Sequence, residues 1–171
     1  MTSIRLIFAI ACQKNFELRQ IDVKGAYLNG TLEEDIYMRQ PKGFIKRGEE
    51  HFVCKLHKSL YGLKQLGRVW HNTLKDHMIS IGFVRGNSDS SIFFKYNQNS
   101  IIVIVGWYVD NGLIAVDTKT TMEEVVKDIC RTFTIQDLGE PIHLLGIKID
   151  HNRNSGVIKL SQPTYIDKIA S

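Results

Sequence analysis

Two aspartates each stand at the end of an apolar segment, and an asparagine directly follows the second one. Asp22 closes the segment 18–23, and Asp110 with Asn111 follows the segment 101–109. Carboxylates brought together from two strands suit Mg²⁺, a hard cation that binds oxygen ligands and the phosphates of substrates. Two such ions about 3.5–4 Å apart stabilise the attacking and the leaving oxygen of an in-line displacement. The pattern is therefore consistent with metal-assisted chemistry at phosphate.

The same residues have a purely structural explanation. Asn111-Gly112 lies between two apolar runs, and Asn-Gly in that setting is the strongest short signal for a hairpin turn. A tight turn over 110–112 accounts for the sequence without any chemistry. The spacing alone leaves both interpretations open.

The elements that position these residues follow from the apolar periodicity. Helices are expected at 3–15, 68–81 and 120–133 and from 162 onward, and strands at 18–23, 35–39, 52–56, 91–96, 101–109, 113–116, 144–150 and 157–160. The strand 18–23, the helix 68–81, two strands that meet at 110–112, the helix 120–133 and the strand 144–150 form a split βαββαβ pattern. The expected fold class is α+β, with a ferredoxin-like antiparallel sheet and its helices on one face. In such a sheet the strand ends that carry Asp22 and Asp110 are neighbours.

The composition indicates one globular domain with a basic segment. The chain has 171 residues, 43% hydrophobic and 23% charged, which suffices for one core and excludes a disordered chain. The net charge of +4 arises in the segment 41–75, which contains eight basic residues and only two glutamates. That segment is either a solvated face or a surface for phosphates. The three cysteines imply no disulfide framework, and no apolar run is long enough to span a membrane.

Motif-like segments follow one another along the chain. They are QIDVKGAYLNG (20–30), IYMRQPKGF (36–44), KLHKSLYGLKQ (55–65) followed by RVW (68–70), YVDN (108–111), DLGE (137–140), LGIKI (145–149) and LSQ (160–162). In this order they resemble the motifs of the copia-type (Ty1/copia) retrotransposon reverse transcriptases. The resemblance runs from about residue 2 to residue 171, and a series in order is far more specific than any single motif.

The resemblance implies a right-hand polymerase core in which two Mg²⁺ ions, or Mn²⁺ in their place, support nucleotidyl transfer. Asp22 and Asp110 would be the metal ligands, and Asn111 would occupy a degenerate catalytic position. The partners would be an RNA or DNA template-primer and a deoxynucleoside triphosphate (dNTP), with no membrane. The basic segment 41–75 would then lie near template and primer phosphates.

Further residues acquire roles through the resemblance. Tyr27 would be an aromatic gate under the incoming sugar, where a bulky ring clashes with a 2′-hydroxyl, and Leu145 and Gly146 would lie in a primer-grip hairpin. The other residues implied to bind the substrate are Lys64, Gln65, Arg68 and Tyr108. Each also has a plain structural explanation: Tyr27 as a core aromatic, Gln65 as a helix-entry residue, and Leu145-Gly146 as strand residues.

The chain departs from the family pattern at three places. Asn111 replaces the second aspartate of the Tyr-x-Asp-Asp box, which removes a charge worth about 4 kcal/mol near 4 Å at an effective dielectric of about 20. At about 1.4 kcal/mol per tenfold in rate, this predicts a weak or inactive enzyme. Leu66-Gly67 replaces a small residue and Pro and is expected to loosen the helix entry. Gly25 replaces a usual Thr, which is expected to cost rigidity.

The domain organisation expected from the resemblance is a single reverse transcriptase domain over 1–171. The fingers would cover about 30–66, the palm about 17–29 and 67–150, and a shortened last helix 162–171. Thumb, RNase H and integrase regions of a polyprotein would be missing partners. By resemblance the location would be the cytoplasm or a virus-like particle, and no targeting signal is visible.

Two other functions compete with a polymerase. One is a non-catalytic remnant that binds nucleic acid, and the other is an unrelated ferredoxin-like RNA-recognition module. The last would need a run of stacking aromatics on its central strands, which the sequence lacks.

Asn before Gly is also prone to spontaneous deamidation, which would restore a carboxylate at Asn111 in some molecules.

Overall fold

The computed structural model describes residues 2–170, which divide into two compact units. The first unit comprises residues 2–24 and 77–170, and the second comprises residues 25–76. Both units mix helices with antiparallel sheets, as the α+β expectation required. Among the described residues, no helix combines the length and the apolar character needed to cross a membrane.

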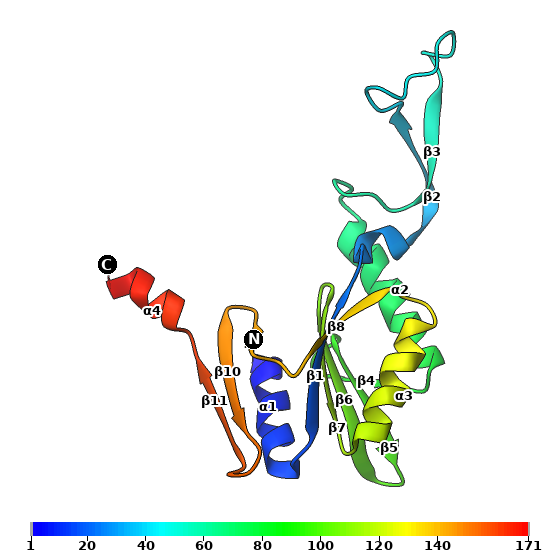
Figure 1. The fold of residues 1–171 in the computed structure, drawn as a ribbon. Coiled ribbons are helices and arrows are strands. Elements are labelled where there is room, and N and C mark those ends of the chain that lie inside the picture. Colours follow the sequence, from blue (N-terminus) through cyan, green and yellow to red (C-terminus); the bar gives the residue numbers. More distant parts are fainter. Residues whose placement is uncertain (1, 171) are drawn as a thin grey trace. The chain divides into compact units, whose positions relative to one another are not determined.

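A six-stranded antiparallel sheet forms the centre of the first unit (Figure 1). Its strands are β1 (Glu17–Val23), β4 (Val84–Arg85), β5 (Ile92–Asn97), β6 (Ser100–Tyr108), β7 (Asn111–Val116) and β8 (Ile135–Gly139). They are arranged in the order β4-β5-β6-β7-β1-β8. The central strands β6 and β7 are runs of buried aliphatic residues, which favour extended structure when both faces are covered.

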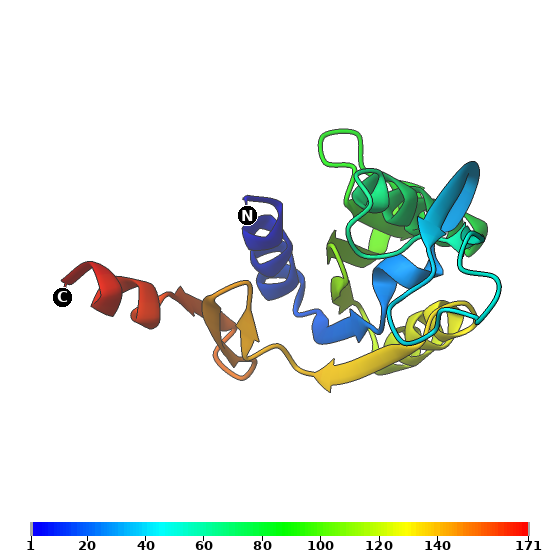
Figure 2. The ribbon, with the colours of Figure 1, turned by 90° about the horizontal axis from the view of Figure 1, so that it is seen from above.

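Helices cover both faces of this sheet (Figure 1), so the expectation that they lie on one face is wrong. α3 (Lys119–Cys130) begins at Thr118, whose side chain accepts a hydrogen bond from the Thr121 amide, and it packs on β1 and β7. α1 (Thr2–Lys14) packs on β6 and β7. Figures 1 and 2 show α1 between the six-stranded sheet and a small three-stranded sheet.

The small sheet has the order β11-β10-β9 and is followed by the last helix. Its strands are β9 (His143–Leu144), β10 (Ile147–Asn152) and β11 (Val157–Ser161), and the helix is α4 (Pro163–Ala170). One core joins α1 to both sheets. It includes Ile7, Phe8, Leu113, Leu144 and Ile147, each at most 3% exposed. The expected end of the last helix, Ser171, lies outside the described residues.

The strand that follows α3 in the large sheet differs from the expectation. The expected partner 144–150 lies instead in the small sheet, and β8 (Ile135–Gly139) pairs with β1. β8 is an edge strand that lacks an alternating apolar pattern, since its interior residues Gln136, Asp137 and Leu138 are all exposed. No periodicity in the sequence could reveal it.

The second unit contains a short helix, a two-stranded ribbon and most of a long helix. These are η1 (Ala26–Asn29), β2 (Thr31–Arg39), β3 (Val53–Lys58) and α2 (Leu66–Ser80), whose last residues belong to the first unit. β2 and β3 are antiparallel, with a register irregularity between Thr31 and Ile36. Both strands are longer than the sequence predicts because their polar ends carry no apolar signal.

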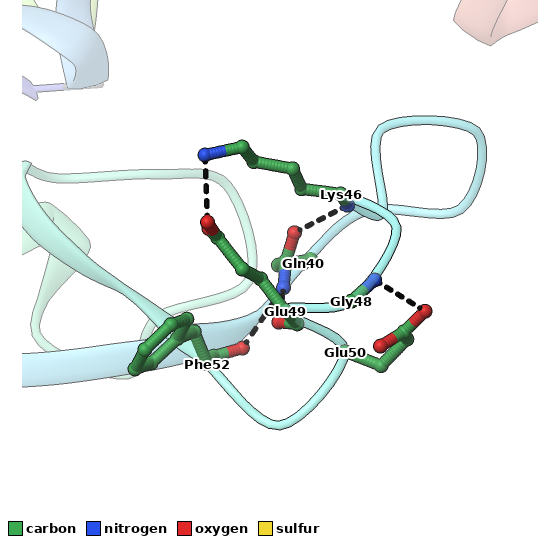
Figure 3. A network of polar contacts seen from close by, with 6 residues as sticks. All are labelled: Gln40, Lys46, Gly48, Glu49, Glu50 and Phe52. Carbon is green, nitrogen blue, oxygen red and sulfur yellow. Dashed lines mark hydrogen bonds and ion pairs between the residues drawn. The ribbon is translucent and has the colours of Figure 1, made fainter.

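The loop between β2 and β3 is organised by one side chain (Figure 3). The Gln40 amide nitrogen donates to the carbonyls of Glu49 (2.6 Å) and Phe52 (3.2 Å), and its oxygen accepts from the Lys46 amide at 2.9 Å. Lys46 also pairs with the Glu49 carboxylate at 2.8 Å. We refer to residues 40–52 as the Gln40 loop.

Candidate active site

The register of β1 and β7 brings the three predicted catalytic residues, of which Asp22 and Asp110 are the predicted metal ligands, to one end of the large sheet. Asp22 lies opposite Asn111, and Val109 and Asp110 form the two-residue turn between β6 and β7. The amide of Val23 donates to the Asp110 carbonyl at 2.9 Å, which ties the turn to the end of β1. The sequence-based expectation that these strand ends are neighbours is therefore correct.

The turn between β6 and β7 lies earlier in the chain than the Asn111-Gly112 pair indicates. Asn111 and Gly112 belong to β7, so the tight turn expected over 110–112 is wrong. Gly112 faces Trp107 on one side and Ile21 on the other, and an added Cβ would lie 2.8 Å and 2.9 Å from their side chains. Glycine is required here by cross-strand packing, not by a turn.

The turn itself has an unusual backbone. Val109 has φ +57°, a conformation that is a genuine outlier for a β-branched residue. Strain of this kind costs on the order of 1–3 kcal/mol and persists only where surrounding structure imposes it. Here the bond from Val23 to Asp110 and the pairing of Tyr108 with Asn111 impose it. Tyr108 is 55% exposed at the end of β6.

The electrostatics show that burial and the charge of Asp110 both act on Asp22. Partial burial raises the pKa of Asp22 above its ordinary value, and the negative charge of Asp110 raises it further. Lys24 acts in the opposite direction. A cation bound at this end of the sheet would relieve the repulsion that Asp22 experiences.

Asn111 is held by hydrogen bonds at both ends of its amide. Its Nδ2 donates to Asp110 Oδ1 at 3.0 Å, and its Oδ1 accepts from Gln20 Nε2 at 3.5 Å. Gln20 is only 8% exposed, and sequence reasoning did not single it out. The available signal was a glutamine two residues before Asp22, which in a strand places both side chains on the same face.

The donor set fits a hard cation but is poor in charge. Asp22 and Asp110 supply carboxylate oxygens and Asn111 one amide oxygen, all of the kind that Mg²⁺ prefers. Across residues 2–170, no three His, Cys, Asp or Glu side chains are grouped as a metal site. The third position of the cluster is the neutral Asn111, so two carboxylates carry all of its negative charge.

Tyr27 lies in the second unit, within η1. Gly25 precedes this helix with φ +58°, a left-handed conformation that glycine adopts readily and in which a threonine would be strained. The backbone at this position thus suits glycine, and the loss of rigidity expected at Gly25 stays a prediction. The Tyr27 carbonyl accepts a hydrogen bond from the Ser59 hydroxyl, and the Tyr27 ring meets the Tyr61 ring edge to face, with centroids 5.4 Å apart and an interplanar angle of 89°.

Gln65 and Arg68 share one acidic partner in the second unit. Gln65 Nε2 and Arg68 donate to the Glu34 carboxylate at 3.0 Å and 3.4 Å, beside a groove of about 580 Å³. Lys64 is exposed just before them. Glu34 was not expected to take part, and as an exposed residue on a strand it left no signal in the sequence.

Leu145 and Gly146 form the two-residue turn between β9 and β10 in the first unit. Both have positive φ, +51° and +77°, and Leu144 pairs with Ile147 across the turn. They are therefore not ordinary strand residues, which was the plain alternative. Leu145 packs against the core that α1 shares with both sheets.

The whole chain matches one protein family. Residues 1–171 match the family model described as reverse transcriptase (RNA-dependent DNA polymerase). The chain belongs to this family. Its relatives include the retrovirus-related Pol polyprotein from transposon TNT 1-94 of Nicotiana tabacum, 42% identical over 99% of this chain, and that from transposon RE1 of Arabidopsis thaliana, 39% identical over 96%. A putative transposon Ty5-1 protein of Saccharomyces cerevisiae is 33% identical over 88% of the chain.

These relatives confirm the resemblance to the copia-type reverse transcriptases. The chain spans 13% of the tobacco polyprotein, 11% of the Arabidopsis polyprotein and 48% of the yeast protein. It thus corresponds to the reverse transcriptase domain of such polyproteins. Reverse transcriptases as a family use divalent metal ions, in keeping with the oxygen-rich cluster at Asp22, Asp110 and Asn111.

Proposed function

We propose that this domain catalyses, or descends from domains that catalyse, DNA synthesis on an RNA or DNA template from dNTPs. The observation that carries the proposal is the register that pairs Asp22 with Asn111 beside Asp110. The family match supplies the reaction class, nucleotidyl transfer. Other regions of a Pol polyprotein would be its partners, as the names of the relatives suggest.

Asp22 and Asp110 would hold Mg²⁺, or Mn²⁺ in its place. Bound there, two ions would stabilise the attacking and the leaving oxygens of the in-line displacement. The chain's own contribution is to hold the two carboxylates at one end of a rigid sheet through the hydrogen bond from Val23. Burial and then repulsion from Asp110 raise the pKa of Asp22, and this supports the role, since a bound cation would relieve the repulsion.

The first unit would contain most of a polymerase palm, and the second unit the fingers with the adjoining parts of the palm. The strand order β6-β7-β1-β8, with helices in the two crossover connections, supports a ferredoxin-like split βαββαβ palm. The ribbon of β2 and β3 between motif segments supports a fingers subdomain over about 30–66, with the palm over about 17–29 and 67–150.

The remaining roles follow from the resemblance, residue by residue. Tyr27 would exclude nucleotides that carry a 2′-hydroxyl, and Leu145-Gly146 would form part of a primer grip. The residues that would contact the nucleotide or its phosphates are Lys64, Gln65, Arg68 and Tyr108. The Glu34 carboxylate would then compete with phosphate for Arg68, since both bind the same guanidinium donors.

We also propose that catalysis is impaired. Asn111 supplies no charge to the metal cluster, and its amide occupies one acceptor site on Asp110 Oδ1. Both effects weaken the hold on a divalent cation.

Primer extension on a primed RNA template tests the proposal, first with Mg²⁺ and then with Mn²⁺. The protein is compared with Asn111→Asp and Asp110→Ala. Extension by Asn111→Asp alone supports both the site and the impairment. Extension by the unaltered protein, lost in Asp110→Ala, would show that Asn111 is a competent ligand. Extension that persists in Asp110→Ala would refute the assignment of the site.

A non-catalytic nucleic-acid-binding role is the second candidate, and the neutral Asn111 is the observation that favours it. Salt-dependent RNA binding that survives Asp22→Ala and Asp110→Ala, with no extension by any variant, would support this role.

A further inference from the structure

The surroundings of Tyr27 contain two side chains with no role assigned above. Ser59 directly follows β3 and is 1% exposed, and its hydroxyl donates to the Tyr27 carbonyl. Tyr61 is 64% exposed and meets the Tyr27 ring edge to face. Ser59 therefore fixes the backbone of Tyr27, and Tyr61 fixes its ring.

The anchor at Ser59 is rigid. Its amide donates to the Gly30 carbonyl at 2.9 Å, so Ser59 holds η1 at Tyr27 and also the residue directly after η1, Gly30. A Cβ at Gly30 would lie 2.5 Å from Val69 and 3.1 Å from the Ser59 hydroxyl oxygen. This packing of Gly30 between β3 and α2 leaves η1 little freedom to shift.

The ring of Tyr27 has a different constraint. It is half-buried, and an edge-to-face neighbour restricts the directions in which it can lie. Tyr61 lies on the loop just before Gly62, which has φ +103°. Because Tyr61 is largely exposed, the hydrophobic core does not require its ring. Its contact with the Tyr27 ring is therefore the feature from which we infer a role.

We propose that Tyr61 and Ser59 are positioning residues that set the sugar selectivity of nucleotide binding by fixing Tyr27. The proposal rests on the proposed function, in which Tyr27 excludes a 2′-hydroxyl. Exclusion by a ring requires the ring to stay in place, because a ring that can swing aside admits the larger sugar. Tyr61 holds the orientation of the Tyr27 ring, and Ser59 holds the position of the Tyr27 backbone.

The test measures the dissociation constants of dATP and ATP on the full chain bound to a primer-template with a templating thymine and a 3′-terminated primer. The preference for dATP over ATP is compared among the unaltered protein, Tyr27→Val, Tyr61→Leu, Tyr61→Phe and Ser59→Ala. We expect Tyr27→Val to lose most of the preference. Tyr61→Leu and Ser59→Ala should lower it about two- to tenfold, the range that one aromatic pair or hydrogen bond provides. Tyr61→Phe keeps the ring edge and should keep the preference.

The outcomes separate the two proposals. If Tyr27→Val lowers the preference and Tyr61→Leu does not, Tyr27 is a gate but Tyr61 does not position it. If Tyr61→Leu weakens dATP and ATP equally, its role is merely structural and the inference is wrong. Loss of preference in Tyr61→Phe would also refute positioning by the ring edge. If the unaltered protein shows no preference, or Tyr27→Val leaves it intact, the proposed gate itself fails and the inference fails with it.

Melting temperatures identify any variant that is unfolded, and Tyr61→Leu, at an exposed position, keeps the test valid if Ser59→Ala unfolds.

Discussion

The side chain of Asn111 donates a hydrogen bond to the carboxylate of its neighbour Asp110, with Nδ2 and Oδ1 3.0 Å apart. An aspartate at this position has no N–H to donate and would add a third negative charge near Asp22 and Asp110. The asparagine thus stabilises the cluster when no cation is bound. The same bond weakens the cluster as a metal site.

Replacing Asn111 by Asp should therefore have opposite effects with and without metal. Without a divalent cation, repulsion should lower the melting temperature by roughly 2–4 °C for each kcal/mol lost. With Mn²⁺ or Mg²⁺, Asn111→Asp should gain more stability than the unaltered protein, because it binds the ion more tightly. Thermal unfolding with and without each metal measures both effects.

The exposed Asn154, in the turn after β10, offers a matched control. Asn154→Asp adds the same charge away from the aspartates and should not change the metal response. An equal metal response in both variants would contradict the site.

The raised pKa of Asp22 predicts a pH dependence of stability. A carboxyl whose pKa is higher in the folded than in the unfolded state destabilises the fold once pH rises above its unfolded value, near 3.8. Asp22→Asn should therefore be more stable than the unaltered protein at neutral pH, with the difference vanishing below about pH 3.8. Chemical denaturation across pH measures this. Asp110→Asn should lower the pKa of Asp22, and an unchanged Asp22 titration by NMR would refute the coupling.

His77 predicts an opposite pH dependence in a higher range. It is 9% exposed at the end of α2, its ring packs edge to face on Phe133, and burial lowers its pKa. Within the described residues its Nε2 is buried without a hydrogen-bond partner. The folded state resists protonation, so stability should fall as pH decreases below about 6.5, the unfolded value.

The variant His77→Phe tests this by removing the titrating group. Its free energy of unfolding should lose the slope near and below pH 6.5 that the unaltered protein shows. His143→Gln, at an exposed position on β9, should keep the slope. Identical slopes in all three proteins would exclude His77 as the cause.

Two glycines of the second unit should respond to alanine in opposite directions. Gly67 is in the first turn of α2 with open space around its missing Cβ, so Gly67→Ala should stabilise by about 0.4–1 kcal/mol. At Gly30 the added Cβ would collide with Val69, and Gly30→Ala should destabilise by about 1–3 kcal/mol. Urea unfolding measures both, and a stabilising Gly30→Ala would mean that the packing around Ser59 is looser than described.

Asn111 should resist deamidation while the protein is folded. The reaction needs the Gly112 amide to attack the Asn111 side chain, but Asn111 lies in a central strand and its amide is bonded at both ends. Peptide mass spectrometry of aged protein should find Asn111 intact when folded and converted when unfolded in urea. The Asn29-Gly30 pair provides an internal comparison in the same digest. Equal rates at Asn111 in both states would show that β7 opens readily at this point.

The sequence predicted the long periodic elements and the meeting of Asp22 with Asp110, because apolar runs and motif order carry that information. It did not predict β8, whose exposed polar residues have no periodicity. It misplaced the β6–β7 turn because Asn-Gly is a strong local signal, whereas Gly112 is fixed by Trp107 and Ile21, contacts made only after folding. Gln20, Glu34 and Ser59 were missed for the same reason, since each acts through a partner distant in sequence.

The Gln40 loop illustrates how one residue can make order cooperative. A single carboxamide bonds the backbone at Lys46, Glu49 and Phe52 together (Figure 3). When that side chain leaves, the Lys46 amide and the Phe52 carbonyl lose this partner at once, and the Glu49 carbonyl keeps the Phe52 amide alone. The loop should therefore open as one event, and its amides should exchange with solvent at a common rate, although nearly every other side chain in it is exposed.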